Sequence, residues 1–506
     1  MEVMFRKKIC HGELSQGKTR EKSVASMVDW RQSEANIMEK LTILHTNDLH
    51  SHLENWPKIR RYLDSRRRAL QDISGVLTVD LGDFVDRWHP LTEATNGKAN
   101  IRLMNEAHYD VATIGNNEGI GNSKVELNHL YDEADFQVLL ANLYDPKTLQ
   151  APDWCQPYTI RETNAGTKVG LIAMTAPFPL TYGPNGWDIR QPMELLPAMV
   201  SRLRKQVDVL VLMSHLGLSA DLRIAQDLPQ LDVIIGSHTH HLLPEGRVEN
   251  GVLLAAAGKF GQHIGEVQLL LDEEHRLVKR EAHTVETASL PAFAEDEEEI
   301  NGYLAEGHRL LQAQQVAQLP FTLERNLASE HSLIRETLVA LKERGQTEAA
   351  VLNTGLFLTE LPAGVVDQDQ LHECLPHPMH LIRVTLKGRD MYRLVLEMEK
   401  NRFFLRQFPV YGMGFRGKIF GEIVYSGIEY DPINRRVLWQ GKDLEPEKDY
   451  TLTTVDHFMF VPFFPTIEIM GDNEFLFPEF IRSVLGHYLA GHYPRVSKQG
   501  IMENRR

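Results

Sequence analysis

Short apolar runs alternate with amphipathic stretches between residues 41 and 285 of the chain. Such runs, bounded by polar turns, predict β-strands, whereas the helical apolar spacing over 59–70 and 192–205 predicts helices. The predicted strands cover residues 41–46, 76–81, 111–114, 137–141, 169–173, 207–213, 233–235 and 252–257. This alternation of strands and helices predicts a layered α/β domain.

The pattern changes after residue 285. Residues 294–299 are acidic, and 300–319 have the spacing of an amphipathic helix. Helical and β-rich patterns are mixed beyond it, at 332–342, 388–400, 423–430 and 450–455. We therefore expect three regions after the N-terminal segment: a first domain over 41–285, a linker helix within 286–319, and an α+β domain over 320–506.

The N-terminal segment 1–40 is polar and has no strong period. Its basic residues Arg6, Lys7 and Lys8 are not followed by the apolar stretch of a secretory signal. We expect either a disordered tail or a start codon placed too early, since Met38 lies just before the first predicted strand. A cytoplasmic location is the corresponding expectation.

Composition narrows the possible partners. The chain has 506 residues, which favours two domains, and a formal net charge of −15 without a long basic run. This charge argues against a nucleic-acid or anionic-membrane partner, and no apolar run is long enough to span a membrane. A small phosphorylated substrate is compatible with it, because a bound metal reverses the local field. The three cysteines form no CxxC pair, which argues against a disulfide framework or a thiolate zinc site.

Five of the predicted strands end in residues that can bind metals. These residues are Asp48, His50, Asp83, Asn116, His215, His238 and His240. Because ligands of open α/β sheets bind outside the carboxyl ends of the strands, we expect these side chains to converge on one crevice. A lone Asp-x-His or Gly-Asp is common by chance, but turn chemistry does not explain the joint pattern.

The ligand types indicate which metals and which chemistry to expect. Asp83 has two carboxylate oxygens and could bridge two ions. Mixed imidazole and carboxylate ligation favours Mn, Zn, Fe or Co over Mg or Ca. Two divalent ions roughly 3.5–4 Å apart can clamp the attacking and leaving oxygens of a phosphoryl displacement. The pattern therefore predicts a two-metal phosphoesterase.

The motifs resemble those of a known family. They are Asn47-Asp48-Leu49-His50, Gly82-Asp83, Gly115-Asn116-Asn117-Glu118, Ser214-His215 and Ser237-His238-Thr239-His240. Their order resembles the metallophosphoesterase (calcineurin-like) superfamily, and within it a cytosolic bacterial branch of the 5′-nucleotidase and 2′,3′-cyclic phosphodiesterase family. The resemblance implies a four-layer α/β/β/α sandwich followed by an α+β domain that binds the substrate.

The same resemblance implies how the ligands divide between two divalent ions. One ion would be held by Asp48, His50, Asp83 and His240. The other would be held by Asp83, Asn116, His215 and His238.

The resemblance fails at a catalytic position. The family has a histidine where this chain has Asn117, and its acidic partner would fall at Ile120. Asn117 can donate a hydrogen bond but carries no charge. His52 and Arg87 are the candidates to supply the missing donor or charge, and either could instead be a solvated polar residue.

The substrate positions match less well than the metal ligands. The turn that begins at Asn353 has Leu358 where the family has a phosphate-binding arginine, and residues 461–465 replace a glycine-rich loop. Tyr411 and Phe458 are candidates for stacking on a nucleobase, although a buried Phe is the commoner arrangement. Arg416 is a candidate phosphate contact, although an ordinary surface arginine is the commoner case.

Three functions remain open at this point. The first is a metal-dependent hydrolase of phosphate esters, with nucleotides as the expected substrates. The second is a metal-containing nucleotide-binding or sensing protein with little turnover, suggested by the missing histidine and arginine. The third is a scaffold that metals only stabilise, which would need a closed and fully ligated site. The sequence leaves the oligomeric state open.

Overall fold

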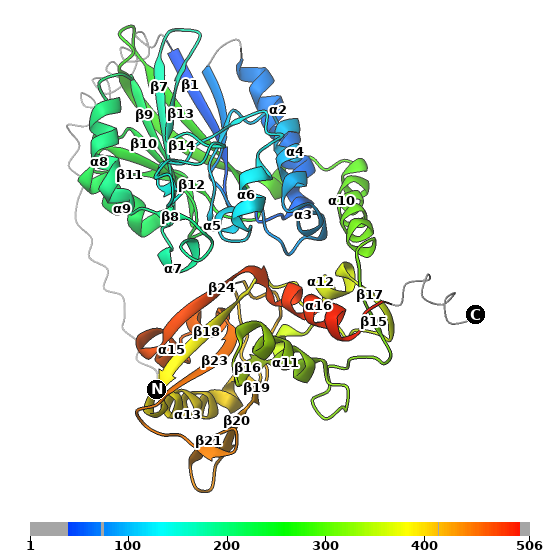
Figure 1. The fold of residues 1–506 in the computed structure, drawn as a ribbon. Coiled ribbons are helices and arrows are strands. Elements are labelled where there is room, and N and C mark those ends of the chain that lie inside the picture. Colours follow the sequence, from blue (N-terminus) through cyan, green and yellow to red (C-terminus); the bar gives the residue numbers. More distant parts are fainter. Residues whose placement is uncertain (1–38, 72–74, 413, 496–506) are drawn as a thin grey trace, which may run out of the picture.

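The computed structural model describes residues 39–71, 75–412 and 414–495. Figure 1 shows two bodies, with helix α10 (Glu295–Gln312) running along one side from the first to the second. The predictions for residues 1–38 lie outside the described part. The first strand, β1, begins at Glu39, two residues before its predicted start.

The first body contains two six-stranded sheets. One has the order β14-β13-β1-β2-β3-β4. Its strands are β1 (Glu39–Thr46), β2 (Gly75–Asp80), β3 (Val111–Ala112), β4 (Gln137–Val138), β13 (His263–Leu271) and β14 (Leu277–Glu286). The other has the order β11-β12-β10-β9-β7-β6. Its strands are β6 (Tyr158–Glu162), β7 (Lys168–Thr175), β9 (Val209–His215), β10 (Val233–Gly236), β11 (Leu242–Glu249) and β12 (Val252–Ala257).

The two sheets pack face to face. Strand β9 shows this, because its side chains alternate between two cores. Val209 and Val211 join an inner cluster that also contains Leu41 and Val79 from the other sheet. Leu210, one position along, joins an outer cluster beneath the helices. Such a strand is buried on both faces and therefore reads as a continuous apolar run.

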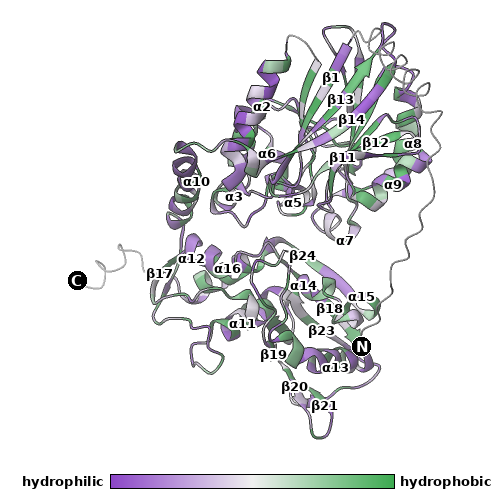
Figure 2. Ribbon diagram, turned by 180° about the vertical axis from the view of Figure 1, so that it is seen from behind, coloured by the Kyte–Doolittle hydropathy of each residue, from purple (hydrophilic) through white to green (hydrophobic). Residues whose placement is uncertain are grey.

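Helices cover the outer face of each sheet. Helix α2 (Trp56–Leu70) packs on the β1 sheet, and α8 (Pro192–Leu203) and α9 (Leu218–Asp227) pack on the β9 sheet. The same layers can be followed in Figure 2, where α10 is largely hydrophilic. The four-layer α/β/β/α sandwich expected from the motifs is confirmed.

The second body is α+β, as predicted. Its main sheet has the order β19-β16-β23-β18-β24. These strands are β16 (Ala349–Asn353), β18 (His380–Lys387), β19 (Ile423–Ser426), β23 (Asp449–Val455) and β24 (Asp472–Phe480). A small sheet of β20 (Ile428–Asp431), β21 (Arg436–Trp439) and β22 (Lys442–Asp443) follows β19. The helices are α11 (Leu333–Gly345), α12 (Gln368–Cys374), α13 (Gly388–Leu405), α14 (His457–Phe460), α15 (Pro465–Met470) and α16 (Ile481–His492).

The linker helix was predicted too late in the chain. Helix α10 starts within the acidic run and ends at Gln312, and Gln315–Leu319 forms strand β15. The acidic residues stabilise the positive end of the helix dipole, which explains the early start. Strand β15 pairs with β17 (Gly364–Asp367) and buries Ala317 and Leu319. The paired residues are 45 to 52 positions apart in the chain, so local spacing does not reveal the pairing.

The two bodies are in direct contact. Helix α10 packs closely on α3 (Pro90–Thr95) of the first body, and a Cβ at Gly307 would lie 2.2 Å from the backbone nitrogen of Leu91. The next residue of α10, His308, pairs with Asp369 of α12. Within the described residues, no helix is both long and apolar enough to cross a bilayer.

Candidate metal centre

The seven candidate ligands lie where strands β1, β2, β3, β9 and β10 end. Five of them have a left-handed backbone, with φ of 51° at Asp48, 50° at His50, 53° at Asp83, 74° at His238 and 57° at His240. Each such conformation costs on the order of 1–3 kcal/mol in a residue other than glycine. Strain concentrated in this way is typical of functional sites.

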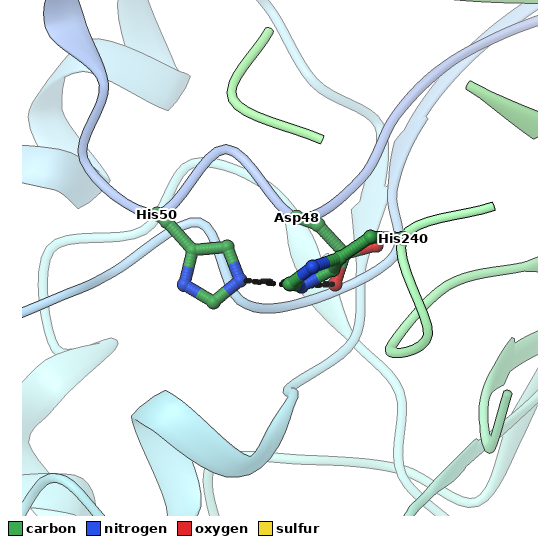
Figure 3. Close-up of side chains that lie close together, drawn as sticks. All are labelled: Asp48, His50 and His240. Carbon is green, nitrogen blue, oxygen red and sulfur yellow. Dashed lines mark hydrogen bonds and ion pairs between the residues drawn. The ribbon is translucent and has the colours of Figure 1, made fainter. Parts of the chain in front are cut away.

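The first group of ligands contains Asp48, His50 and His240. Figure 3 shows the three side chains pointing toward one another. His50 Nε2 lies 3.1 Å from His240 Nε2 and 4.0 Å from Asp48 Oδ1, and His240 Nε2 lies 3.7 Å from the same oxygen. One cation could accept all three donors.

The second group contains Asp83, His215 and His238. Asp83 Oδ2 lies 3.4 Å from His215 Nε2 and 3.6 Å from His50 Nε2 of the first group. One carboxylate oxygen therefore faces both groups, which is the position that a bridging ligand needs. The structure thus brings six of the seven predicted ligands into two groups, with Asp83 facing both.

Two buried atoms test whether this site fits cations. Asn116 Oδ1 and His215 Nε2 are both buried without a hydrogen-bond partner. His215 Nδ1 donates to the carbonyl of Leu81 at 2.7 Å, which leaves the lone pair of Nε2 free. An unsatisfied buried polar atom costs about 1–3 kcal/mol, and an amide oxygen and an imidazole nitrogen are both atoms that can bind a divalent cation. The donor set therefore fits the implied metals.

Close packing makes glycine necessary beside the ligands. A Cβ at Gly115 would lie 2.0 Å from Asp83 Oδ1 and 2.5 Å from His215 Cε1. Any larger residue would displace the bridging carboxylate. The Gly-Asn sequence at 115–116 is thus explained by close approach.

Charges around the ligands shift their pKa values. Burial would lower the pKa of His215, but the charge and hydrogen bonding of Asp83, together with Asp48 and the Leu81 carbonyl, outweigh burial and raise the pKa to about 10. Burial would raise the pKa of Asp83, but His215 and His50 hold it well below its usual range. Burial, aided by His215, lowers the pKa of His238 to about 4. Protons and cations therefore compete for this site.

Glu118 is a positioning residue to which the motif analysis gave no role. Its carboxylate accepts hydrogen bonds from the backbone nitrogens of Asp83, Val85 and Gly115. It therefore ties the loop after β2 to the loop after β3. Burial, together with the charge of Asp83, raises the pKa of Glu118 to about 7.

Asp86 is a second residue that the sequence did not indicate. Its Oδ2 lies 3.1 Å from His50 Nδ1. The same oxygen accepts a hydrogen bond from the guanidinium of Arg416 of the second body at 2.5 Å, which forms an ion pair. Burial would raise the pKa of Asp86, but the charge of Arg416, together with His50 and the Trp88 backbone, outweighs burial and lowers it. The only sequence signal was an aspartate three positions after Asp83.

Asn117 and His52 are the candidates to replace the family's missing catalytic histidine, and they have different surroundings. Asn117 Nδ2 is 2.8 Å from His50 Nδ1, so this side chain borders the metal site. The ring of His52 packs on Phe260, with centroids 3.9 Å apart, and its Nδ1 pairs with Glu54. Its catalytic role stays a prediction.

Arg87 does not fit the role considered for it. Its guanidinium donates to four acceptors, namely Glu93, Glu126, Asn96 and the carbonyl of Gly121. The prediction that Arg87 supplies the missing charge is therefore wrong in this arrangement, because those partners already hold its donors.

The candidate substrate-binding residues differ in their exposure to solvent. Tyr411 is 82% exposed, so its role in stacking on a base stays a prediction. Asn353 is buried and donates to the carbonyl of Phe420. Phe458 is fully buried, with the ring of Phe464 stacked on it at 5.3 Å, so the prediction that it stacks on a base is wrong for this arrangement. The 461–465 segment, which replaces the glycine-rich loop, supplies that covering ring.

Comparison with known proteins agrees with this geometry. Residues 41–242 match the calcineurin-like phosphoesterase family model, and residues 312–460 match the 5′-nucleotidase C-terminal domain. The uncharacterized metallophosphoesterase YunD of Bacillus subtilis is 37% identical over 464 residues, which covers 89% of this chain and 99% of that relative. The chain belongs to the calcineurin-like metallophosphoesterase family. This metallophosphoesterase is therefore a hydrolase, and members of its family use two divalent metal ions.

Solved structures support the same fold for this metallophosphoesterase. The NAD nucleotidase of Haemophilus influenzae is 16% identical, with a TM-score of 0.61 over 90% of this chain and 96% of that one. A 5′-nucleotidase precursor from Thermus thermophilus is 21% identical, with a TM-score of 0.54 over 90% and 97%. Both matches span the two bodies.

Proposed function

We propose that this hydrolase acts on nucleotides through a two-metal centre, as a 5′-nucleotidase or a 2′,3′-cyclic phosphodiesterase. The observation that carries the proposal is the position of Asp83 Oδ2 between His50 and His215. Relatives support the substrate class. The 5′-nucleotidase of Vibrio cholerae is 25% identical over 364 residues, 63% of this chain and 61% of that relative.

The chain's own residues would divide the work. When bound, two divalent ions would clamp the oxygens on either side of the reacting phosphorus. Mixed His, Asp and Asn ligation favours Mn, Zn, Fe or Co for this role. Asn117, at the edge of the ligands, would donate a hydrogen bond to the phosphoryl group, and Tyr411 would offer a ring to the base.

Phosphate release from a panel of nucleotides tests the proposal. The purified chain, supplied with each of the four metals, should hydrolyse nucleoside monophosphates or cyclic nucleotides. Asp83→Asn removes the charge between the two groups and should lower kcat/KM by at least about 10²-fold, the usual scale for losing one stabilising group. His129→Gln, at an exposed ion pair, is the control and should match the wild type.

A second candidate function is a metal-containing nucleotide-binding or sensing protein with little turnover. The uncharged Asn117 favours it. Tight nucleotide binding that stays metal-dependent, without release of phosphate from any member of the panel, would support this alternative and contradict the first.

The expected partner is thus a small phosphorylated molecule, with no nucleic acid or membrane. A cytoplasmic location is part of the same proposal. Fractionation of the producing cells tests it, and recovery outside the cytoplasm would contradict it.

A further inference from the structure

One interdomain contact reaches the metal ligands. Arg416 belongs to the second body, and Asp86 lies in the loop after β2 of the first. Their ion pair joins positions 330 residues apart. Asp86 is also in contact with His50, so a residue of the second body is one side chain away from a candidate ligand.

Asp86 is placed to fix the orientation and the tautomer of the His50 ring. The Nε2 of His50 faces Asp48, Asp83 and His240, while Nδ1 faces Asp86. A histidine that binds a metal through Nε2 carries its proton on Nδ1, and a carboxylate that accepts this proton fixes the ring. Asp86 is placed to be that acceptor.

The same arrangement has a consequence for Asn117. Its amide also faces His50 Nδ1 at 2.8 Å, and amide oxygen and nitrogen are assigned from hydrogen bonding. If Nδ1 carries the proton, the amide oxygen turns to the ring. The amide NH₂ group then turns toward the site.

Asp86 itself depends on the second body. Its side chain is 1% exposed, and a buried carboxylate needs a charged partner as well as hydrogen bonds. The backbone nitrogen of Trp88 donates to Oδ1 at 3.3 Å, and Arg416 supplies the one cationic side chain paired with Asp86 among the described residues, apart from the histidine it holds.

Arg416 is also fixed in place. Its backbone nitrogen donates to His377 Nδ1 at 2.9 Å, and the opposite nitrogen, His377 Nε2, donates to the carbonyl of Leu356. Arg416 is therefore anchored to the turn after Asn353 in the core of the second body.

We propose that Arg416, Asp86 and His50 form an interdomain relay, in which docking of the second body sets the metal affinity of the His50 site. Arg416 and Asp86 are positioning residues in this relay. It rests on the proposed role of His50 as a metal ligand, but it requires no particular substrate.

Metal titration without substrate tests the relay. The metal-free full chain is titrated calorimetrically with Mn²⁺ and with Co²⁺, whose visible spectrum reports the ligands. The wild type should bind two ions. Asp86→Asn should weaken one of them by about 10–100-fold, the usual effect of losing such a partner, and leave the other nearly unchanged.

The arginine variants separate the relay from a direct contact with substrate phosphate. Arg416→Met should weaken the same ion as Asp86→Asn, and Arg416→Lys should recover most of the loss. The double variant should be little worse than Asp86→Asn alone, because the two residues act through one contact. Asp443→Asn and Arg436→Met, which break an exposed ion pair of the second body, are matched controls that should bind metal normally.

Three results would overturn the relay. The first is an unchanged metal affinity in Arg416→Met together with a raised KM. The second is an equal loss of affinity for both ions in Asp86→Asn. The third is a wild type that binds fewer than two ions. Normal metal binding without nucleotide turnover would instead contradict the proposed function alone. If Asp86→Asn fails to fold, the Met and Lys variants of Arg416 still decide the question.

Discussion

Asn117 is the side chain on which we expect the proposed chemistry to depend most directly. It borders His50 and its backbone nitrogen donates to Asp83 Oδ1 at 2.8 Å, so both ends of the residue touch candidate ligands. A neutral amide at this position can orient a phosphoryl group but cannot offset its charge. We therefore expect chemistry, rather than metal binding, to be limited by this residue.

Asn117→His should raise kcat by up to about 10²-fold with little change in KM, since a protonatable donor would then face the site. Steady-state kinetics on the best nucleotide of the panel measures this. Asn434→His, at an exposed turn, is the control. Unchanged or lower kcat, with two metals still bound, would mean that another group already supplies the charge.

At the scale of elements, α10 joins the two bodies by packing tightly on α3. Gly307 permits this approach, because a Cβ there would lie 2.2 Å from the Leu91 nitrogen and 2.5 Å from the Pro90 carbonyl carbon. Gly302 of the same helix has nothing within 4 Å of its Cβ position. The helix therefore contains one glycine that packing requires and one that it does not.

Substituting these glycines should change stability in opposite directions. Gly302→Ala should raise the free energy of unfolding by about 0.5–1 kcal/mol, because alanine favours the helix. Gly307→Ala gains the same propensity but forces α10 from α3, and a net loss of about 1–3 kcal/mol is expected. Urea unfolding of both variants tests this, and a stabilised Gly307→Ala would show that the two helices can separate freely.

At the scale of the whole molecule, a buried ion pair connects the two bodies. The Arg482 side chain of α16 is 1% exposed and pairs with Glu93 of α3, and it also donates to the backbone carbonyl of Arg87. His372 of α12 approaches the same carbonyl at 3.1 Å. These contacts hold the second body against the loop that carries Asp83 and Asp86.

Glu93→Gln should lower the free energy of unfolding at pH 7 by about 3 kcal/mol, because it leaves Arg482 buried without its anionic partner. Burial would raise the pKa of Glu93, but Arg482 and Arg87 outweigh it and hold the pKa far below 4.5. The difference in free energy of unfolding between the wild type and Glu93→Gln should therefore be complete above pH 4.5. It should shrink as the pH falls toward the lowered pKa of Glu93.

Urea unfolding of the wild type and of Glu93→Gln across this pH range measures the difference. Glu447→Gln, at an exposed pair with Arg389, should cost less than about 1 kcal/mol and serves as the control. An equal cost for both variants would mean that the interdomain pair is effectively solvated.

Local sequence determined much of the first body and the positions of its candidate ligands. The strands that carry ligands are buried and mostly parallel, so their apolar runs are continuous, and their ends fall at one edge of each sheet. Residues such as Asp48 and His50, or His238 and His240, are placed by the few residues around them. The side chains at these strand ends could therefore be identified before the structure was known.

Only the tertiary structure decided what surrounds those ligands. The contact of Asp86 with Arg416, the burial of Phe458 beneath Phe464, and the pairing of β15 with β17 each join segments that no local period relates. Arg87 likewise could not be assigned, because its acceptors come from separate helices. Strand periodicity and turn chemistry are short-range, whereas charge pairing and burial depend on which surfaces meet once the chain has folded.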